Sequence, residues 1–230
     1  MSDNVNNPII GKKSLIRSQI RTLRSSLSPH ERSMKSHALC TEVGRILGLE
    51  EGEREENTTI EARILADRKA ASTPALRKGD AVALYSAFSD EANLDELIDL
   101  CFRNEIQVAL PCMNPKGSTR PMDMRMVSRS AWHDGTIPFV QNPLKRIAHD
   151  DAAVASFPMA APDALEAIIV PLVAFDEQRR RLGYGGGNYD AYLPLVSETC
   201  IVIGVAFAEQ RVVRVPAENH DLALPVIVYA

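Results

Sequence analysis

Five short apolar segments constrain the fold of this chain more than any other feature of its sequence. They occupy residues 81–87, 106–111, 167–175, 201–207 and 226–229. Apolar runs of this length are typical of strands buried on both faces of a parallel sheet. A helical segment, Leu94–Arg103, with Asn93 as its predicted cap, separates the first two. We therefore predict a β-α-β unit within a three-layer α/β/α fold, Rossmann-like, with a largely parallel central sheet.

Two further segments complete this part of the chain. Met122–Val127 has the composition of a short strand. Tyr189–Val196 reads as a helix, but Pro194 lacks a backbone N–H and predicts a kink or a restart within it.

The first predicted helix, Lys12–Leu27, has apolar and basic residues on different faces. Helical spacing relates the apolar set Ile16, Ile20, Leu23 and Leu27, and it relates the basic set Lys13, Arg17, Arg21 and Arg24. We expect an amphipathic helix with a basic stripe.

A second helix is predicted to follow immediately. Ser28 is its cap, Pro29 occupies the first helical position and Glu31 reaches back to the cap. The helix is expected to end near Gly48.

Residues 50–78 are charged and poor in large apolar groups, with a short helical possibility around Ile60–Leu65. Such a composition offers little burial to offset the entropy of ordering. We interpret the whole chain, residues 1–230, as a single domain with an exposed insertion at residues 50–78.

Composition excludes several classes of protein. A 45% hydrophobic chain of 230 residues can bury one sizeable core, and its net charge of -4 gives no general attraction to nucleic acid or anionic membranes. No apolar run approaches the roughly 20 residues of a membrane span. The four cysteines form no Cys-x-x-Cys pair, which disfavours zinc and disulfides. We expect a cytoplasmic monomer with no nucleic-acid or membrane partner.

The strongest chemical signal follows the segment 167–175. Four of the twelve glycines fall within residues 183–187, before a predicted helix. Glycine lets backbone N–H groups approach an anion, and Arg181 adds a forked cationic donor. A flexible turn with a solvated arginine run is the alternative, and neither a P-loop nor a dinucleotide fingerprint occurs here. The position at the end of a central strand favours phosphate binding.

The segment Arg181-Leu182-Gly183-Tyr184-Gly185-Gly186-Gly187-Asn188-Tyr189-Asp190 resembles the signature of 5-formyltetrahydrofolate cyclo-ligases. The similarity extends over nearly all of the chain outside residues 50–78. It includes Lys13-Ser14-Leu15-Ile16-Arg17, residues 85–91, 110–111, 170–176 and 204–207, Gln210, residues 215–216, and His220-Asp221.

The resemblance implies an ATP site and a folate site. Lys13 to Arg17 (with Ser14, Leu15 and Ile16) and the loop Arg181 to Tyr189 are expected to bind ATP, with Lys13, Arg181 and Tyr189 in the catalytic set. Lys13 and Arg17 are four residues apart, so both can face one polyphosphate. The resemblance places the pterin near Ser86 and Glu91, with contacts from Tyr184 to Asn188.

The resemblance also implies that Asp190 and Asp221 hold Mg²⁺, which favours one or two carboxylates together with phosphate oxygens. The expected reaction is the ATP-dependent cyclisation of 5-formyltetrahydrofolate to 5,10-methenyltetrahydrofolate.

One position departs from the family pattern. Asn188 stands where the family usually has an aromatic residue, so an ATP-dependent relative with another formyl or amide substrate stays an alternative. A binding protein without turnover and a sugar-phosphate isomerase are the other two. Stabilisation by Mg-ATP would contradict the isomerase.

Overall fold

A seven-stranded sheet forms the centre of the protein, as described by a computed structural model over residues 8–49, 60–66, 75–88, 90–216 and 223–230. Its strand order is β1-β9-β8-β5-β2-β3-β4. The strands are β1 (Arg63–Ala66), β2 (Ala81–Ala83), β3 (Gln107–Met113), β4 (Met122–Val127), β5 (Leu165–Pro171), β8 (Ile201–Ala206) and β9 (Val226–Tyr229). The five inner strands are parallel, whereas β1 and β4 pair antiparallel at the edges. The predicted, largely parallel α/β fold is confirmed.

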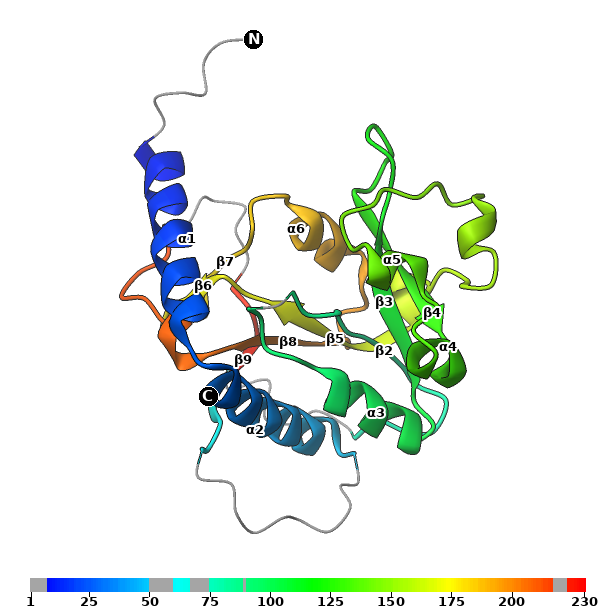
Figure 1. Cartoon of the computed structure of the whole chain (residues 1–230), viewed down its shortest axis with the longest axis horizontal. Helices are drawn as coiled ribbons and strands as arrows, with labels where there is room; N and C mark the ends of the chain where they lie inside the picture. The colour runs from blue at the N-terminus through cyan, green and yellow to red at the C-terminus, as the bar shows by residue number, and fades with distance from the viewer. Residues whose placement is uncertain (1–7, 50–59, 67–74, 89, 217–222) are drawn as a thin grey trace.

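Helices cover the sheet on both faces (Figure 1). On one face lie α2 (Pro29–Leu47) and α3 (Asp95–Arg103), whose apolar side chains join the larger core cluster. The other face packs against α6 (Asn188–Tyr192) and the 3-10 turn η4 (Leu193–Leu195) through Tyr192 and Leu193. Three layers are therefore present. The helix predicted over 189–196 does change character at Leu193, the residue before Pro194.

The remaining helices are short or lie beside the sheet. They are α1 (Pro8–Ser26), α4 (Arg129–His133), α5 (Pro138–Gln141), η2 (Ala152–Val154), η3 (Pro162–Ala164) and η5 (Ala208–Gln210). No helix of the described residues is long and apolar enough to cross a membrane.

Local sequence signals predicted both ends of α2, whereas the predicted cap of α3 is wrong by one residue. Ser28 and Glu31 form the predicted capping box, and α2 ends before Gly48, which has a φ of 67°. Asn93 is not the N-cap of α3, since Leu94 holds that position. Instead, the Asn93 side-chain oxygen accepts the N–H of Asp95 at 2.6 Å, an alternative local turn that Asn readily forms.

The apolar segment 167–175 is not one continuous strand. It divides into β5 and β6 (Ala174–Phe175), and β6 pairs with β7 (Arg181–Leu182) in a separate two-stranded sheet. At the break, Pro171 cannot donate to a ladder, and the Val173 carbonyl accepts from the Gln210 side chain at 3.2 Å. This break turns the chain out of the central sheet and toward the glycine-rich loop.

The segment 50–78 contributes an edge strand. The helix considered around Ile60–Leu65 is wrong, because Arg63–Ala66 pairs with β9 as β1. Ile60, Ala62 and Leu76 pack against the core. Residues 50–59 and 67–74 lie outside the described residues, so the insertion as a whole stays a prediction.

The basic stripe predicted for α1 is wrong at one position. Arg24 is only 1% exposed, whereas Leu23, assigned to the apolar face, is 49% exposed. Ile16 and Ile20 do face inward and pack with Val173, Leu182 and Val215. Arg24 follows Ile16 and Ile20 at four-residue spacing, so this charged side chain enters the protein on the inward face of α1.

Strands β2 and β5 lie side by side where the chain direction across the sheet reverses. From β2 the chain proceeds through α3 to β3, and from β5 it proceeds to β8 on the other side. Open α/β sheets bind ligands in the crevice at the carboxyl ends of such a strand pair.

Candidate active site

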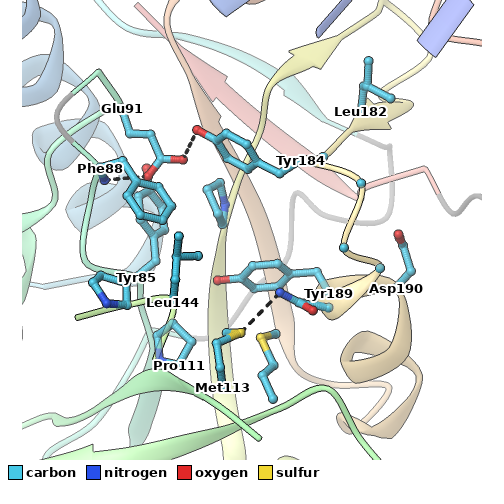
Figure 2. A pocket seen from close by; sticks show the side chains of 18 of the residues that line it. Tyr85, Phe88, Glu91, Pro111, Met113, Leu144, Leu182, Tyr184, Tyr189 and Asp190 are labelled. Carbon is cyan, nitrogen blue, oxygen red and sulfur yellow. Dashed lines mark hydrogen bonds between the residues drawn. The ribbon is translucent and has the colours of Figure 1, made fainter. Parts of the chain in front are cut away.

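A cavity of about 820 Å³ lies at this reversal point. Tyr85 and Ser86 follow β2 at its floor, and Pro171 ends β5 there. The other walls come from α1, from the glycine-rich loop and from residues 139–144. Segments distant in the sequence thus meet around one space, shown from close by in Figure 2.

The glycine-rich loop, residues 183–187, connects β7 to α6 and lines the cavity throughout. Gly185 and Gly187 have φ values of +99° and +67°, which side chains rarely tolerate. A Cβ built on Gly185 would lie 3.4 Å from the Arg17 guanidinium. Glycine at 185 is therefore favoured by the backbone conformation, and α1 approaches it to ordinary contact distance. The helix that follows has only five residues, so it aligns few peptide dipoles and the loop amides must supply most of the anion attraction.

One face of α1 supplies the cationic side of the cavity. Lys13, Arg17 and Arg21 line it together with Ile10. The Nε of Arg17 donates to the Gly183 carbonyl at 2.8 Å, which holds helix and loop together. Three neighbouring residues do not line the cavity. These are Ser14, the 58% exposed Leu15, and Ile16, which packs against the core.

Arg181 and Asp190 both line the cavity and form an ion pair, with Nη2 of the arginine donating to Oδ1 of the aspartate. The Arg181 side chain is 6% exposed, whereas that of Asp190 is 50% exposed. Asp190 therefore keeps a solvent-facing carboxylate beside the glycine-rich loop. Asp221 lies outside the described residues. Within those residues, no group of three or more His, Cys, Asp or Glu side chains could hold a metal ion.

Tyr189 lines the cavity, but its hydroxyl has almost no solvent-accessible surface. Among the described residues it is buried without a hydrogen-bond partner. Burial, followed by the negative charge of Glu91, raises the pKa of Tyr189 above its ordinary value. The phenol is therefore neutral at physiological pH and carries a proton that no described residue accepts.

Glu91 is a buried carboxylate between the two sides of the cavity, only 6% exposed. Its Oε1 accepts the hydroxyl of Tyr184 at 2.5 Å, and its Oε2 accepts the backbone N–H of Phe88 at 2.8 Å. Figure 2 shows Tyr184 and Glu91 pointing toward one another. Burial raises the pKa of Glu91, although both hydrogen bonds and the charge of Arg24 oppose this rise.

The far end of the cavity is apolar. Leu110, Met113 and Met122 come from β3 and β4, and Phe139 and the 74% exposed Leu144 come from the segment that follows α4. Asn188 lies at this end, where its amide donates to the sulfur of Met113 at 3.4 Å. Ser86 also lines the cavity. The surface suits a flat, largely apolar ligand such as an aromatic ring.

The structure thus brings together Lys13, Arg17, Ser86, Glu91 and the whole stretch 181–190 around one cavity. Sequence reasoning missed Arg24 and Asp90. Arg24 donates to the Asp90 carboxylate and to the Tyr184 hydroxyl, which in turn donates to Glu91. One sequence signal could have identified Arg24 as a neighbour of the site. Arg17 and Arg24 are two helical turns apart, so they face nearly the same direction.

Comparisons with known proteins agree with this geometry. Residues 9–230 match the family described as the 5-formyltetrahydrofolate cyclo-ligase family. The 5-formyltetrahydrofolate cyclo-ligase of Haemophilus influenzae is 25% identical over 214 residues, covering 93% of this chain and 95% of that enzyme. The Escherichia coli K12 enzyme of the same name is 31% identical over 148 residues, covering 64% and 76%.

Solved structures share the fold. A 5,10-methenyltetrahydrofolate synthetase from Mycoplasma pneumoniae superposes with a TM-score of 0.62 at 19% identity, covering 94% of this chain and 96% of the other. One from Aquifex aeolicus gives 0.60 at 21% identity, covering 94% and 89%. Since the family match spans almost the whole sequence, this chain belongs to the 5-formyltetrahydrofolate cyclo-ligase family.

Proposed function

We propose that this chain catalyses the ATP-dependent cyclisation of 5-formyltetrahydrofolate to 5,10-methenyltetrahydrofolate, with release of ADP and phosphate. The observation that carries the proposal is the composition of one cavity. A cationic, glycine-rich side built by α1 and residues 181–187 opens directly onto an apolar side that contains the buried carboxylate Glu91. Two ligands of opposite character can therefore meet in it. Family membership supports the same reaction.

The cationic side binds ATP in this proposal. Lys13 and Arg17 approach the phosphates from α1, Arg181 approaches from β7, and the loop amides supply N–H donors. Ser14 to Ile16 stay predicted contacts on the same helix.

The donor set fits Mg²⁺ carried by the nucleotide. Asp190 is a half-exposed oxygen donor at the cavity edge, and Mg²⁺ usually takes only one or two carboxylates besides phosphates and waters. Asp190, with Asp221 as a second predicted ligand, would hold it. When bound, Mg²⁺ offsets the negative charge of the phosphate groups.

The apolar side binds the reduced folate. Glu91 receives one hydrogen bond on each oxygen, so each oxygen retains a lone pair that can accept from the ring N–H and amino group of a pterin. Phe88 and Tyr85 line the space beside it, and Ser86 lies at its floor. Asn188 contributes an amide at the far wall, which we propose as a substrate contact.

The chemistry requires alignment more than acid–base catalysis. The N5-formyl oxygen attacks the γ-phosphorus, and the bond between that phosphorus and the β–γ bridging oxygen breaks to release ADP. N10 then attacks the activated formyl carbon, and loss of phosphate and of the N10 proton leaves the methenyl bridge. Lys13 and Arg181 offset charge on the transferred group, and the neutral Tyr189 hydroxyl donates a hydrogen bond to the reacting groups.

We place this activity in the cytoplasm and expect a monomer. All four cysteines are buried and unpaired, as in a reducing compartment. Light scattering during size-exclusion chromatography tests the monomer.

The direct test follows the methenyl chromophore in the near-ultraviolet, with and without Mg-ATP. Product should form only with Mg-ATP, and Asp190→Ala should reduce the rate at least about 100-fold. Asp150→Ala is the matched control, because Asp150 is 79% exposed and does not line the cavity. If folded protein binds ATP without forming product, the substrate assignment is wrong, and Asn188→Tyr becomes the next variant.

A further inference from the structure

Arg24 is a buried charge that the proposed reaction leaves without a role. It lies near the end of α1 and is 1% exposed. An arginine is buried this completely only where its charge and donors are matched. Asp90 provides the match, since its Oδ2 accepts from Nε at 3.0 Å and from Nη2 at 2.8 Å.

The same guanidinium also contacts the hydroxyl and the ring of Tyr184. Nη2 of Arg24 donates to the Tyr184 hydroxyl at 2.6 Å, and the guanidinium carbon lies 5.6 Å from the centroid of the Tyr184 ring. Arginine cannot accept a hydrogen bond. The hydroxyl oxygen must therefore act as the acceptor toward Arg24, which leaves its single proton free to be donated elsewhere.

That proton is directed at Glu91. The Tyr184 hydroxyl donates to Oε1 at 2.5 Å, while the Phe88 N–H fixes Oε2. A chain of hydrogen bonds thus runs from Arg24 through a residue of the glycine-rich loop to the carboxylate on the opposite wall. The Phe88 ring packs edge-on against the Tyr184 ring, with centroids 6.0 Å apart, which further limits the movement of the tyrosine.

We propose that Arg24 is a positioning residue for the folate: by fixing the direction of the Tyr184 hydroxyl, it holds the Glu91 carboxylate in the orientation that receives the pterin. This inference rests on the proposed function. Without Arg24, the tyrosine can rotate away and Glu91 loses one of its two fixed contacts. Loss of Arg24 should weaken folate recognition more than ATP binding, because Lys13, Arg17 and Arg181 do not take part in this chain of hydrogen bonds.

The test compares Arg24→Lys, Tyr184→Phe and the double variant in the methenyl assay. Lysine keeps a positive charge near Asp90 but lacks the fork that reaches both partners. Each single variant should raise KM for 5-formyltetrahydrofolate about tenfold and KM for ATP less than about threefold, as expected for one charge-linked hydrogen bond. The double variant should be no worse than Tyr184→Phe alone, because Arg24 acts through that hydroxyl.

Arg125→Lys is the matched control. Arg125 is 4% exposed and binds the main-chain carbonyls of Phe157 and His149, and none of these residues lines the cavity. This variant should lose stability without a change in KM for the folate.

Three results would overturn the inference: an unchanged folate KM in a folded Arg24→Lys protein, equal rises in both KM values, or effects that add in the double variant. If Arg24→Lys does not fold, Tyr184→Phe is the remaining test. An unchanged KM for 5-formyltetrahydrofolate in that variant refutes the inference. A wild-type protein without product refutes the proposed function instead, so the two failures are distinguishable.

Discussion

Asp176 precedes the glycine-rich loop in the sequence and Asp190 follows it, and the surroundings of the two carboxylates differ. Asp176 is fully buried, and its two oxygens accept from the N–H groups of Gln178, Arg180 and Val215 and from the Arg180 side chain. Asp190 is half exposed and is paired with Arg181. A carboxylate whose lone pairs are all used can only hold the fold, whereas one that faces a cavity can bind a ligand.

The largest expected effect is on stability, at Asp176, whose two oxygens are both hydrogen-bonded. Asp176→Ala should lower the free energy of unfolding by about 3–5 kcal/mol, because it strands Arg180 and three backbone N–H groups. Urea denaturation measures the change. The exposed control Asp150→Ala should stay within about 0.5 kcal/mol of wild type. A small loss at Asp176 would remove the contrast between the two aspartates.

Asp190→Asn should have a small effect on stability and a large effect on Mg-ATP binding. We expect a loss of less than about 1 kcal/mol in unfolding free energy, because the pair is half exposed. Thermal stabilisation by Mg-ATP should disappear, since the asparagine supplies no negative charge for the cation. Thermal unfolding with and without Mg-ATP measures both quantities. Full retention of the Mg-ATP effect would show that Asp190 is as structural as Asp176.

Tyr189→Phe extends the comparison to a neutral group. Its hydroxyl is buried without a described partner, so its removal should leave stability unchanged or slightly improved. The value of kcat/KM should nevertheless fall about tenfold, because in the proposed mechanism this hydroxyl donates a hydrogen bond to the reacting groups. Parallel measurement of unfolding and kinetics tests this. Lower stability with normal activity would assign the hydroxyl to the fold.

Glu91 lies between the two extremes, because it is buried like Asp176 yet lines the cavity like Asp190. Its folded-state pKa is raised, mainly by burial, above the ordinary 4.5. The stability that this group contributes is therefore complete below the unfolded pKa and is lost as pH rises through the folded pKa.

Glu91→Gln removes that titration. The stability of the variant relative to wild type should increase from about pH 4 toward pH 8, while folate binding weakens. Urea unfolding across this range measures the small difference. Parallel stability curves for the two proteins would show that Glu91 titrates alike in the folded and unfolded states.

Local sequence patterns were sufficient to predict most strands and helices and to locate the glycine-rich loop. Strands β4 and β9 were predicted with the observed ends, and for β9 the reason is that an apolar run requires burial wherever it lies in the fold. The capping box of α2 was equally readable, because Ser28 and Glu31 act within one turn. The glycine-rich loop predicted close turns, and glycine does occupy the positive φ values found at residues 185 and 187, which side chains rarely adopt.

Contacts between segments that are distant in the sequence could be read only from the folded protein. Helical spacing assigned Arg24 to the basic stripe, but its guanidinium is buried against Asp90 and Tyr184, which come from distant parts of the chain. The division of residues 167–175 into β5 and β6 likewise depends on Gln210, whose side chain takes the carbonyl that a sheet partner would otherwise use. Periodicity reports which faces are apolar, whereas the pairing of buried charges depends on contacts between segments that no local pattern encodes.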